Sequence, residues 1–398
     1  MLLKLRPKSE LYFYIAVYYF GTMRIGFDAK RLFNNFTGLG NYSRFVVKSL
    51  VDYYPQHHYT LYSPKIKDHP ETKSFRTNPR LLIRTPPRWV KGSGFGSFWR
   101  SVNLGNIASR DGMDIFHGLS NELPVSKPKG LKTVVTIHDL IFVRHPELYG
   151  KIDAAIYRKK LENACESADS ILAISRQTAN DLTAFMKIDK DRIQVVYQGC
   201  DEIFKQKYPV LDIQNVLRKY NLPEDYVLTV GTLEQRKNAL LLLKAATLLD
   251  KKINIVLVGK RTSYQDQLDE YISSHHLKDR VYFIHDVSFV DLPRIYKGAR
   301  VFVYPSRFEG FGIPILEAIH AGVPVIAATG SCLEEAGGPS CVYVHPDDHE
   351  ALAKNIESLI NDATLRNESL NGSLKYVQRF EPANIAKDLI EVYEKVKG

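Results

Sequence analysis

Residues 301–330, which read VFVYPSRFEGFGIPILEAIHAGVPVIAATG, hold the pattern that decides the fold of this 398-residue chain. Val301–Tyr304 is a short apolar run rich in β-branched and aromatic residues, which predicts a buried strand. A glycine-rich loop over 305–313 follows, and the proline after it suits the first turn of a helix, where no N–H is needed. Gly322 predicts the end of that helix, and residues 323–327 predict a second buried strand. Strand, loop, helix and strand in this order form one unit of a parallel sheet.

Two glutamates of this stretch fall at one end of the predicted sheet. Glu309 lies in the loop and Glu317 lies in the helix that follows it. In parallel α/β sheets, ligands bind beyond the carboxyl ends of the strands, where the helix N-termini point. Two interpretations of Glu317 follow: a carboxylate that accepts both hydroxyls of a ribose, or an acid in the first helical turn that interacts with the helix dipole.

The rest of the chain repeats this plan in two sets of elements. A strand over 23–28 precedes a glycine loop over 34–41 and a helix from Tyr42 to about residue 52, and Tyr226–Val230 opens the second set. A single core does not grow to this length, so we expect two domains. The predicted fold class is α/β, with two doubly wound Rossmann-like domains that face each other across a cleft. The predicted boundaries are 1–22 for a leader, 23–205 and 206–380 for the domains, and 381–398 for a terminal helix.

The first 22 residues differ from the rest. Three basic residues precede an uncharged, aromatic-rich segment over 11–20, which is too short to span a bilayer and is followed by no small-residue cleavage site. Two interpretations stay open, a non-structural leader ahead of a start at Met23 or a weak membrane-associating segment. The sequence has no run of 18 or more apolar residues, and so no spanning helix is expected.

Composition and charge narrow the class of protein. The four cysteines show no CxxC spacing, which favours buried thiols in a reducing compartment over a disulfide framework or a zinc site. Residues 1–200 carry 30 Lys and Arg against 17 Asp and Glu, whereas the remainder carries 24 against 27. A basic N-terminal half favours an anionic partner. The segment 64–100, with nine basic and two acidic residues, predicts either a membrane-surface or acidic-acceptor patch, or a solvated loop whose aromatic residues pack on the domain.

Polar residues follow several predicted strands. Gly38 and Gly40 lie in the loop after the first strand, where glycine lets the backbone approach a ligand. His138 follows a buried strand over 133–137 and points to the cleft, although a lone histidine is more often structural. Arg236 and Lys237 follow Tyr226–Val230, and their charges with the N–H groups of the 310–312 loop suit a diphosphate.

These motifs resemble those of family 4 glycosyltransferases of the GT-B fold, from about residue 23 to the C-terminus. The most specific part runs from Pro305 to Pro324, where Glu309 and Glu317 match the paired glutamates of that family. The segment GTLEQRKN over 231–238 is similar to a branch that contains many mannosyltransferases, although Thr232 stands where many members carry arginine.

The resemblance implies a role for each candidate residue. Arg236 and Lys237 would hold the donor diphosphate, Glu317 the ribose and Glu309 the hydroxyls of the transferred sugar. His138 would lie over that sugar near its C6 hydroxyl, and the backbone near Val287 would contact the base. Glu309, His138, Lys237 and Arg236 are thus the expected catalytic residues. The expected donor-binding residues are Gly38, Gly40, Arg236, Lys237, Val287, Gly310, Phe311, Gly312, Ile313 and Glu317.

The resemblance also implies the reaction. A hexose would pass from a nucleotide sugar to a glycan or lipid-linked glycan of a cell-surface polysaccharide such as lipopolysaccharide, and its anomeric configuration would be retained. GDP-mannose is the expected donor in preference to a UDP-sugar. The N-terminal domain would bind this acceptor and the C-terminal domain the donor, and the terminal helix would return to the N-terminal domain. No cofactor, metal ion or nucleic acid is expected. We expect a cytoplasmic protein. A further expectation is peripheral contact with the acidic surface on the inner face of the membrane. An epimerase or phosphorylase on the same fold, or a non-catalytic sugar-nucleotide-binding subunit, are the alternatives.

Overall fold

The computed structural model describes residues 21–87 and 96–398. The expectation for a leader over 1–22 therefore falls outside the described residues, apart from the last two. The same holds for Trp89 and Phe95, two of the aromatic residues in the basic segment. In the rest of that segment, Phe75 and Trp99 are buried in the domain, whereas Phe98 is exposed.

The first half of the chain forms a seven-stranded, all-parallel sheet. Its order is β3-β2-β1-β4-β5-β6-β7, so the direction of winding reverses between β1 and β4. Apolar side chains on the strands are buried because helices cover both faces, as parallel sheets require. The strands are β1 (Arg24–Asp28), β2 (His58–Tyr62), β3 (Leu81–Arg84), β4 (Ile115–Gly118), β5 (Lys132–Ile137), β6 (Ser170–Ala173) and β7 (Ile193–Val195).

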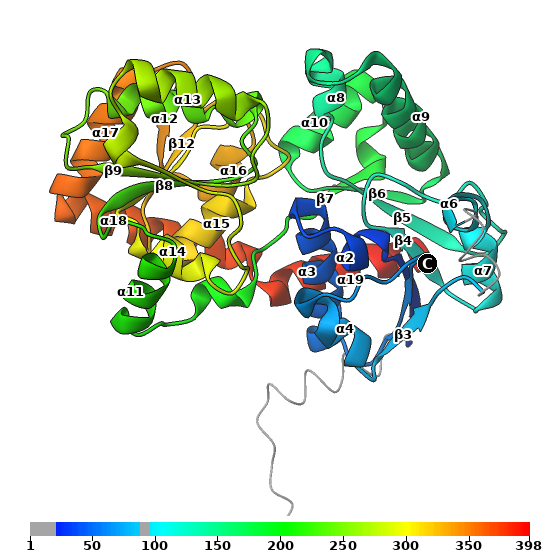
Figure 1. Cartoon of the computed structure of the whole chain (residues 1–398). Coiled ribbons are helices and arrows are strands. Elements are labelled where there is room, and N and C mark those ends of the chain that lie inside the picture. The colour runs from blue at the N-terminus through cyan, green and yellow to red at the C-terminus, as the bar shows by residue number, and fades with distance from the viewer. Residues whose placement is uncertain (1–20, 88–95) are drawn as a thin grey trace, which may run out of the picture.

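The second half forms a six-stranded parallel sheet in the order β10-β9-β8-β11-β12-β13. Here the reversal lies between β8 and β11, which are hydrogen-bonded neighbours at the centre of the sheet. The strands are β8 (Tyr226–Val230), β9 (Asn254–Val258), β10 (Val281–Ile284), β11 (Val301–Tyr304), β12 (Val325–Ala328) and β13 (Val342–Val344). Two doubly wound α/β domains thus lie side by side (Figure 1).

Helices pack against both sheets, and side-chain caps fix several of their starts. Asp348 and Asp362 accept from backbone N–H groups in the first turns of α17 and α18, and Ser175 does so for α10. In the first domain the longer helices are α2 (Lys30–Asn34), α3 (Gly38–Tyr53), α4 (Lys73–Thr77), α7 (Leu104–Arg110), α8 (Ile141–Arg144), α9 (Lys151–Ser167) and α10 (Arg176–Met186). The second domain has α11 (Val210–Lys219), α12 (Ala239–Ala246), α13 (Tyr264–Ser274), α14 (Leu292–Gly298), α15 (Ile313–His320), α16 (Leu333–Gly337), α17 (His349–Asn361) and α18 (Ala363–Tyr376).

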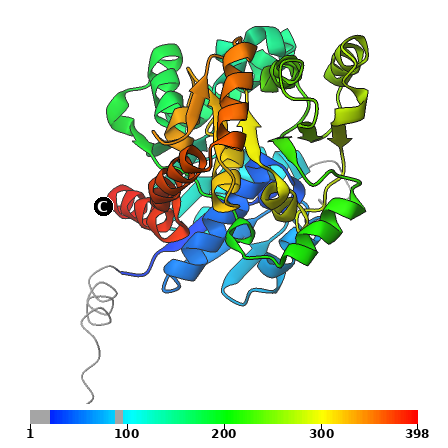
Figure 2. The ribbon, with the colours of Figure 1, turned by 90° about the vertical axis from the view of Figure 1, so that its left-hand side faces the viewer.

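The last helix, α19 (Pro382–Lys397), returns to the first domain, where it packs along α3 (Figures 1 and 2). Tyr393 of α19 is fully buried, and its hydroxyl lies 2.6 Å from Nδ1 of His117 in β4. Pro382 is the first residue of this helix, a position that suits proline because the N–H group there has no partner within the helix. Among the described helices, none is long and apolar enough to cross a bilayer.

The predicted start of the helix after β1 is wrong. The helix after β1 begins at Gly38, four residues before Tyr42, so Gly38 and Gly40 belong to its first turn and not to a loop. The physical reason lies in Asn35, whose Oδ1 accepts from the N–H groups of Thr37 and Gly40 and starts the helix early. Gly40 is required for a different reason from the one expected, because a β-carbon there would lie 1.7 Å from the carbonyl oxygen of Asn35.

Candidate functional site

The two central strands of the second sheet position most of the candidate site. β8 and β11 flank the point where the winding reverses, which is where doubly wound sheets bind ligands. The loop after β8 carries Arg236 and Lys237, and the loop after β11 carries Glu309. Residues that are more than 70 positions apart in the sequence therefore meet at the carboxyl ends of the two central strands.

Four polar side chains form one cluster at this edge. Nζ of Lys237 lies 2.6 Å from Oε1 of Glu309, and a guanidinium nitrogen of Arg236 lies 2.9 Å from Oε2 of the same carboxylate. Tyr304, the last residue of β11, donates its hydroxyl to Oε1 of Glu309 at 3.0 Å and accepts from Nζ of Lys237 at 2.7 Å. Arg236 also donates to the carbonyl oxygen of Phe308 at 2.7 Å, which holds the loop after β11 in place.

The electrostatics of this cluster favour an ionised carboxylate. Burial raises the pKa of Glu309, but the charges of Lys237 and Arg236 outweigh that effect and lower it to about 2. Burial likewise opposes the charge of Arg236, and the carboxylate of Glu309 reverses this so that the pKa of Arg236 is raised. Arg236 also lies 3.3 Å from Oε2 of Glu234, so the two cations face two carboxylates here. The two cations are the groups in this cluster that suit an anionic ligand. The expected cations are thus present, but they are paired with Glu309 in the structure rather than free.

The glycine loop leads from this cluster into α15. Gly312 is the N-cap of α15 with φ 116°, a conformation that favours glycine, and Pro314 occupies its first turn. The thiol of Cys332, at the start of α16, donates to the carbonyl oxygens of Glu309 and Phe311 at 3.0 and 3.4 Å. The start of α16 therefore supports this loop through two hydrogen bonds.

Glu317 lies in α15, after this loop, and its surroundings differ from those of Glu309. Its side chain is buried, and its Oε2 accepts from the hydroxyl of Tyr296 in α14 at 2.8 Å. Burial raises the pKa of Glu317 to about 7, and no cation in the described part of the chain offsets the loss of water. Glu317 is the fifth residue of α15 and not in its first turn, so the interpretation as an acid on the helix dipole does not apply.

The first domain contributes His138, which follows β5. Its ring is buried, its Nε2 lies 2.9 Å from the carbonyl oxygen of Leu119, and it packs edge-on against Tyr42 with 4.6 Å between ring centroids. Burial lowers the pKa of His138 to about 4, and the ring is neutral at pH 7. A β-carbon on Gly310 would lie 2.3 Å from the carbonyl oxygen of His138, so the two domains are in direct contact at the loop after β11.

The remaining predicted residues lie in other elements than the two loops that form this cluster. Val287 follows β10, which is the edge strand of the second sheet, and it is half-buried against the main core. Ile313 is the first residue of α15 and packs against the same core. Gly38 begins α3, and a β-carbon there would meet no atom within 4 Å.

Sequence patterns did not single out three residues that the structure places in the site. Tyr304 reads as one more apolar residue at the end of a buried strand, and Tyr296 and Cys332 lie in elements of unremarkable composition. The one available signal was a tyrosine at the carboxyl end of a strand next to the point where the winding reverses, since a buried hydroxyl needs a partner.

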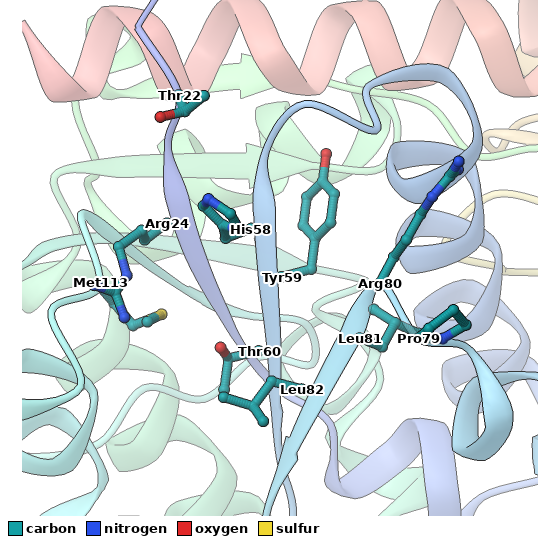
Figure 3. Close-up of a pocket in the computed structure, with 10 residues that line it drawn as sticks. All are labelled: Thr22, Arg24, His58, Tyr59, Thr60, Pro79, Arg80, Leu81, Leu82 and Met113. Atoms are coloured by element: carbon teal, nitrogen blue, oxygen red, sulfur yellow. The ribbon is translucent and has the colours of Figure 1, made fainter.

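A surface groove of about 570 Å³ lies elsewhere in the first domain (Figure 3). Arg24, His58 and Leu81, the first residues of β1, β2 and β3, line it, so it lies at the amino ends of these strands. Ligands of doubly wound sheets bind at the opposite, carboxyl ends. None of the predicted site residues lines the groove, and we do not assign it to the donor.

The fold and the site together define a glycosyltransferase of the GT-B class. Two family models cover the two domains: Glycosyltransferase Family 4 matches residues 37–203, and Glycosyl transferases group 1 matches residues 212–372. The chain belongs to the family 4 glycosyltransferases, as the paired glutamates indicated.

Named relatives agree with this assignment. The chain is 28% identical over 388 residues to O-antigen chain mannosyltransferase B of Escherichia coli, which covers 94% of this chain and all of that protein. Among solved structures, HepE of Anabaena in complex with UDP and glucose has a TM-score of 0.70 at 19% identity and covers 94% of this chain and 100% of its own. WaaG, a glycosyltransferase involved in lipopolysaccharide biosynthesis, has a TM-score of 0.68 at 15% identity and covers 93% and 99%. At these identities the two structures support the fold alone.

Proposed function

We propose that the enzyme transfers mannose from GDP-mannose to a glycan or lipid-linked glycan in the synthesis of a cell-surface polysaccharide. The observation that carries the proposal is the cluster of Arg236, Lys237, Tyr304 and Glu309 at the switch point of the second sheet. The choice of mannose rests on the mannosyltransferase among the relatives. UDP-glucose is the competing donor, because a structural neighbour was solved with UDP and glucose.

In the proposed reaction the cations act on the leaving group. The bond between C1 of the mannose and the diphosphate oxygen breaks while the acceptor hydroxyl forms its bond to the same face of C1. The proton of that hydroxyl passes to the diphosphate oxygen, so configuration is retained. Arg236 and Lys237 stabilise the negative charge that develops on the diphosphate. Glu309, which stays ionised because of these cations, accepts hydroxyls of the sugar.

Residues outside the cluster orient the rest of the donor. Glu317, held by Tyr296, accepts the ribose hydroxyls, and the backbone near Val287 contacts the base. The neutral ring of His138 lies over the sugar from the first domain. The N-terminus of α3, at Gly38, faces the donor phosphates from the same side. No metal ion or organic cofactor takes part in this proposal.

A peripheral contact with an acidic membrane surface completes the proposal. Its support is the outer face of α9, where Ile152 and Ile156 are 78% and 48% exposed and Lys151 and Lys159 are also exposed. An apolar face with flanking cations is typical of helices that lie on anionic lipid. Sedimentation with vesicles of phosphatidylglycerol or phosphatidylcholine tests this, and equal recovery with both lipids, or none with either, would contradict it.

The donor is tested by incubating the purified enzyme with GDP-mannose, UDP-glucose, dTDP- and ADP-sugars and a lipid-linked or glycan acceptor. We expect release of GDP that depends on the acceptor, and NMR of the product should show the same anomeric configuration as the donor. Release from another nucleotide sugar at a higher kcat/KM would identify a different donor. An inverted product would contradict the proposed same-face reaction.

A further inference from the structure

One carboxylate joins the two domains near the site. Glu335 lies in α16 of the second domain, and its Oε2 and Oε1 accept from the backbone N–H groups of Arg176 at 2.8 Å and Gln177 at 3.0 Å. These are the first two residues of α10 in the first domain. The hydroxyl of Tyr197 donates to the same carboxylate at 3.2 Å. A side chain of one domain therefore occupies the N-terminus of a helix in the other.

This contact is electrostatically favourable. The first N–H groups of a helix have no partner within the helix and carry the positive end of its dipole. In α10, Ser175 supplies one acceptor, to the N–H group of Thr178 at 3.0 Å. Glu335 supplies the acceptors for the two N–H groups that remain in this turn, and it brings a full negative charge to them.

Glu335 also belongs to the element that supports the loop after β11. Cys332, at the start of the five-residue α16, donates to the carbonyl oxygens of Glu309 and Phe311. The ring of Phe311 packs against that of Tyr197 with 5.7 Å between centroids. The attachment of α16 to α10 is thus linked to the backbone of Glu309 through Cys332, and to the ring of Phe311 through Tyr197.

On the other side of the boundary, α10 is linked to His138. The hydroxyl of Thr178 donates to the carbonyl oxygen of His138 at 3.2 Å, and that oxygen leaves no room for a side chain at Gly310. The hydrogen bonds of Glu335 to α10 therefore hold His138 in contact with the glycine-rich loop after β11.

We propose that Glu335 is a positioning residue for glycosyl transfer, which sets the arrangement of the two domains in which His138 reaches the sugar held by the cluster of Glu309. It acts through α10 and α16 and does not itself touch the donor. The inference rests on the glycosyltransferase reaction but not on the identity of the donor. Because Arg236, Lys237 and Glu317 all belong to the second domain, loss of the contact should lower the rate of transfer more than it lowers donor affinity.

The test is Glu335→Gln, whose amide can accept one of the two N–H groups but not both. Glu334→Gln is the matched control, because among the described residues this neighbouring carboxylate bonds to Thr329 and Gly330 of its own domain and to none of the first domain. Ala184→Gly, at an exposed position of α10, controls for destabilisation of that helix without a change at the interface. The measurements are kcat at saturating donor and acceptor, donor Kd by calorimetry, and amide hydrogen exchange at Arg176 and Gln177.

We expect Glu335→Gln to lower kcat about tenfold, within the usual range of coupling between two sites, with donor Kd changed by less than about threefold. Exchange at the two amides should be faster than in the wild type, and both controls should keep kcat. Wild-type kcat in Glu335→Gln, or an equal loss in Ala184→Gly, would overturn the proposal. If the wild type transfers no mannose, the proposed donor fails instead, and the same variants are compared with the nucleotide sugar that supports turnover.

Discussion

Glu309 and Glu317 lie in one loop-and-helix segment, yet their surroundings give them opposite electrostatic properties. Both side chains are buried. Glu309 has cationic groups at 2.6 and 2.9 Å, and its pKa is about 2, whereas Glu317 has a tyrosine hydroxyl at 2.8 Å and a pKa of about 7. Burial alone therefore does not decide ionisation here; the loop after β8, which reaches only the first glutamate, does.

This difference separates the two roles. A carboxylate that stays ionised throughout the physiological range can stabilise or orient a reacting sugar at any such pH. A carboxylate that titrates near neutral pH suits binding, because its acceptor strength for hydroxyl groups changes with protonation. Variants that remove the cation, the tyrosine hydroxyl or the Glu317 carboxylate test this difference.

The largest effect is expected from Lys237→Ala, which removes the nearer cation. Without Lys237, the donor diphosphate loses a charged partner and the pKa of Glu309 rises toward its ordinary value. We expect kcat/KM for the nucleotide sugar to fall about 1000-fold, the upper range for one electrostatic group at a reacting centre. Lys244→Ala, an exposed lysine of α12, is the control in steady-state assays. A loss below about threefold would show that Lys237 does not act on the donor.

A smaller loss is expected from Tyr304→Phe, which keeps the ring but removes the hydroxyl between Lys237 and Glu309. We expect kcat to fall about tenfold, in line with loss of a hydrogen bond to a charged group. Tyr226→Phe, in β8, is the control because its buried hydroxyl bonds to the carbonyl oxygen of Ile295, away from the cluster. Equal kcat in the two variants would remove Tyr304 from the site.

The pH dependence of donor binding measures Glu317 directly. Because its pKa is about 7, the fraction ionised increases from pH 6 to pH 8. The ionised form is the better acceptor for ribose hydroxyls, and we expect donor affinity to rise about fivefold over this range. Calorimetry at both pH values should show no such rise in Glu317→Gln. A rise that persists in that variant would assign the pH dependence to another group.

The smallest effect concerns stability. The pKa of Glu317 is raised in the folded state, so between about pH 4.5 and pH 7 the folded protein keeps a proton that the unfolded chain has released. Stability is therefore lost as pH rises through this window, and Glu317→Gln removes that loss. We expect the difference in Tm between variant and wild type to grow by about 2 °C from pH 4.5 to pH 7.5. A constant difference would place the folded pKa of Glu317 close to its ordinary value.

Much of the fold was predictable from local patterns. The buried strands Tyr226–Val230 and Val301–Tyr304 were predicted at their observed boundaries, since continuous apolar runs between glycines and charged residues mark parallel strands. β2 and β3 were missed, because they contain polar residues and β3 lies at the sheet edge. The start of α3 was predicted late because the side chain of Asn35, and not glycine flexibility, decides it.

The site was predictable only as far as single residues carry chemistry. Charged residues after buried strands identified Arg236, Lys237 and Glu309. Their mutual ion pairs could not be predicted, because these depend on the pairing of β8 with β11 across more than 70 residues. The same is true of Tyr304 and Glu335, whose partners are set by strand register and by the contact between the domains.

The division of roles between Glu309 and Glu317 is tested most directly by measuring donor Kd and kcat side by side for Glu309→Gln and Glu317→Gln at pH 7.5. We predict that Glu309→Gln loses about 1000-fold in kcat without weaker donor binding, because two cations remain for the diphosphate. We predict that Glu317→Gln raises donor Kd about fivefold and keeps kcat within about threefold. The same balance of Kd and kcat effects in both variants would contradict the account.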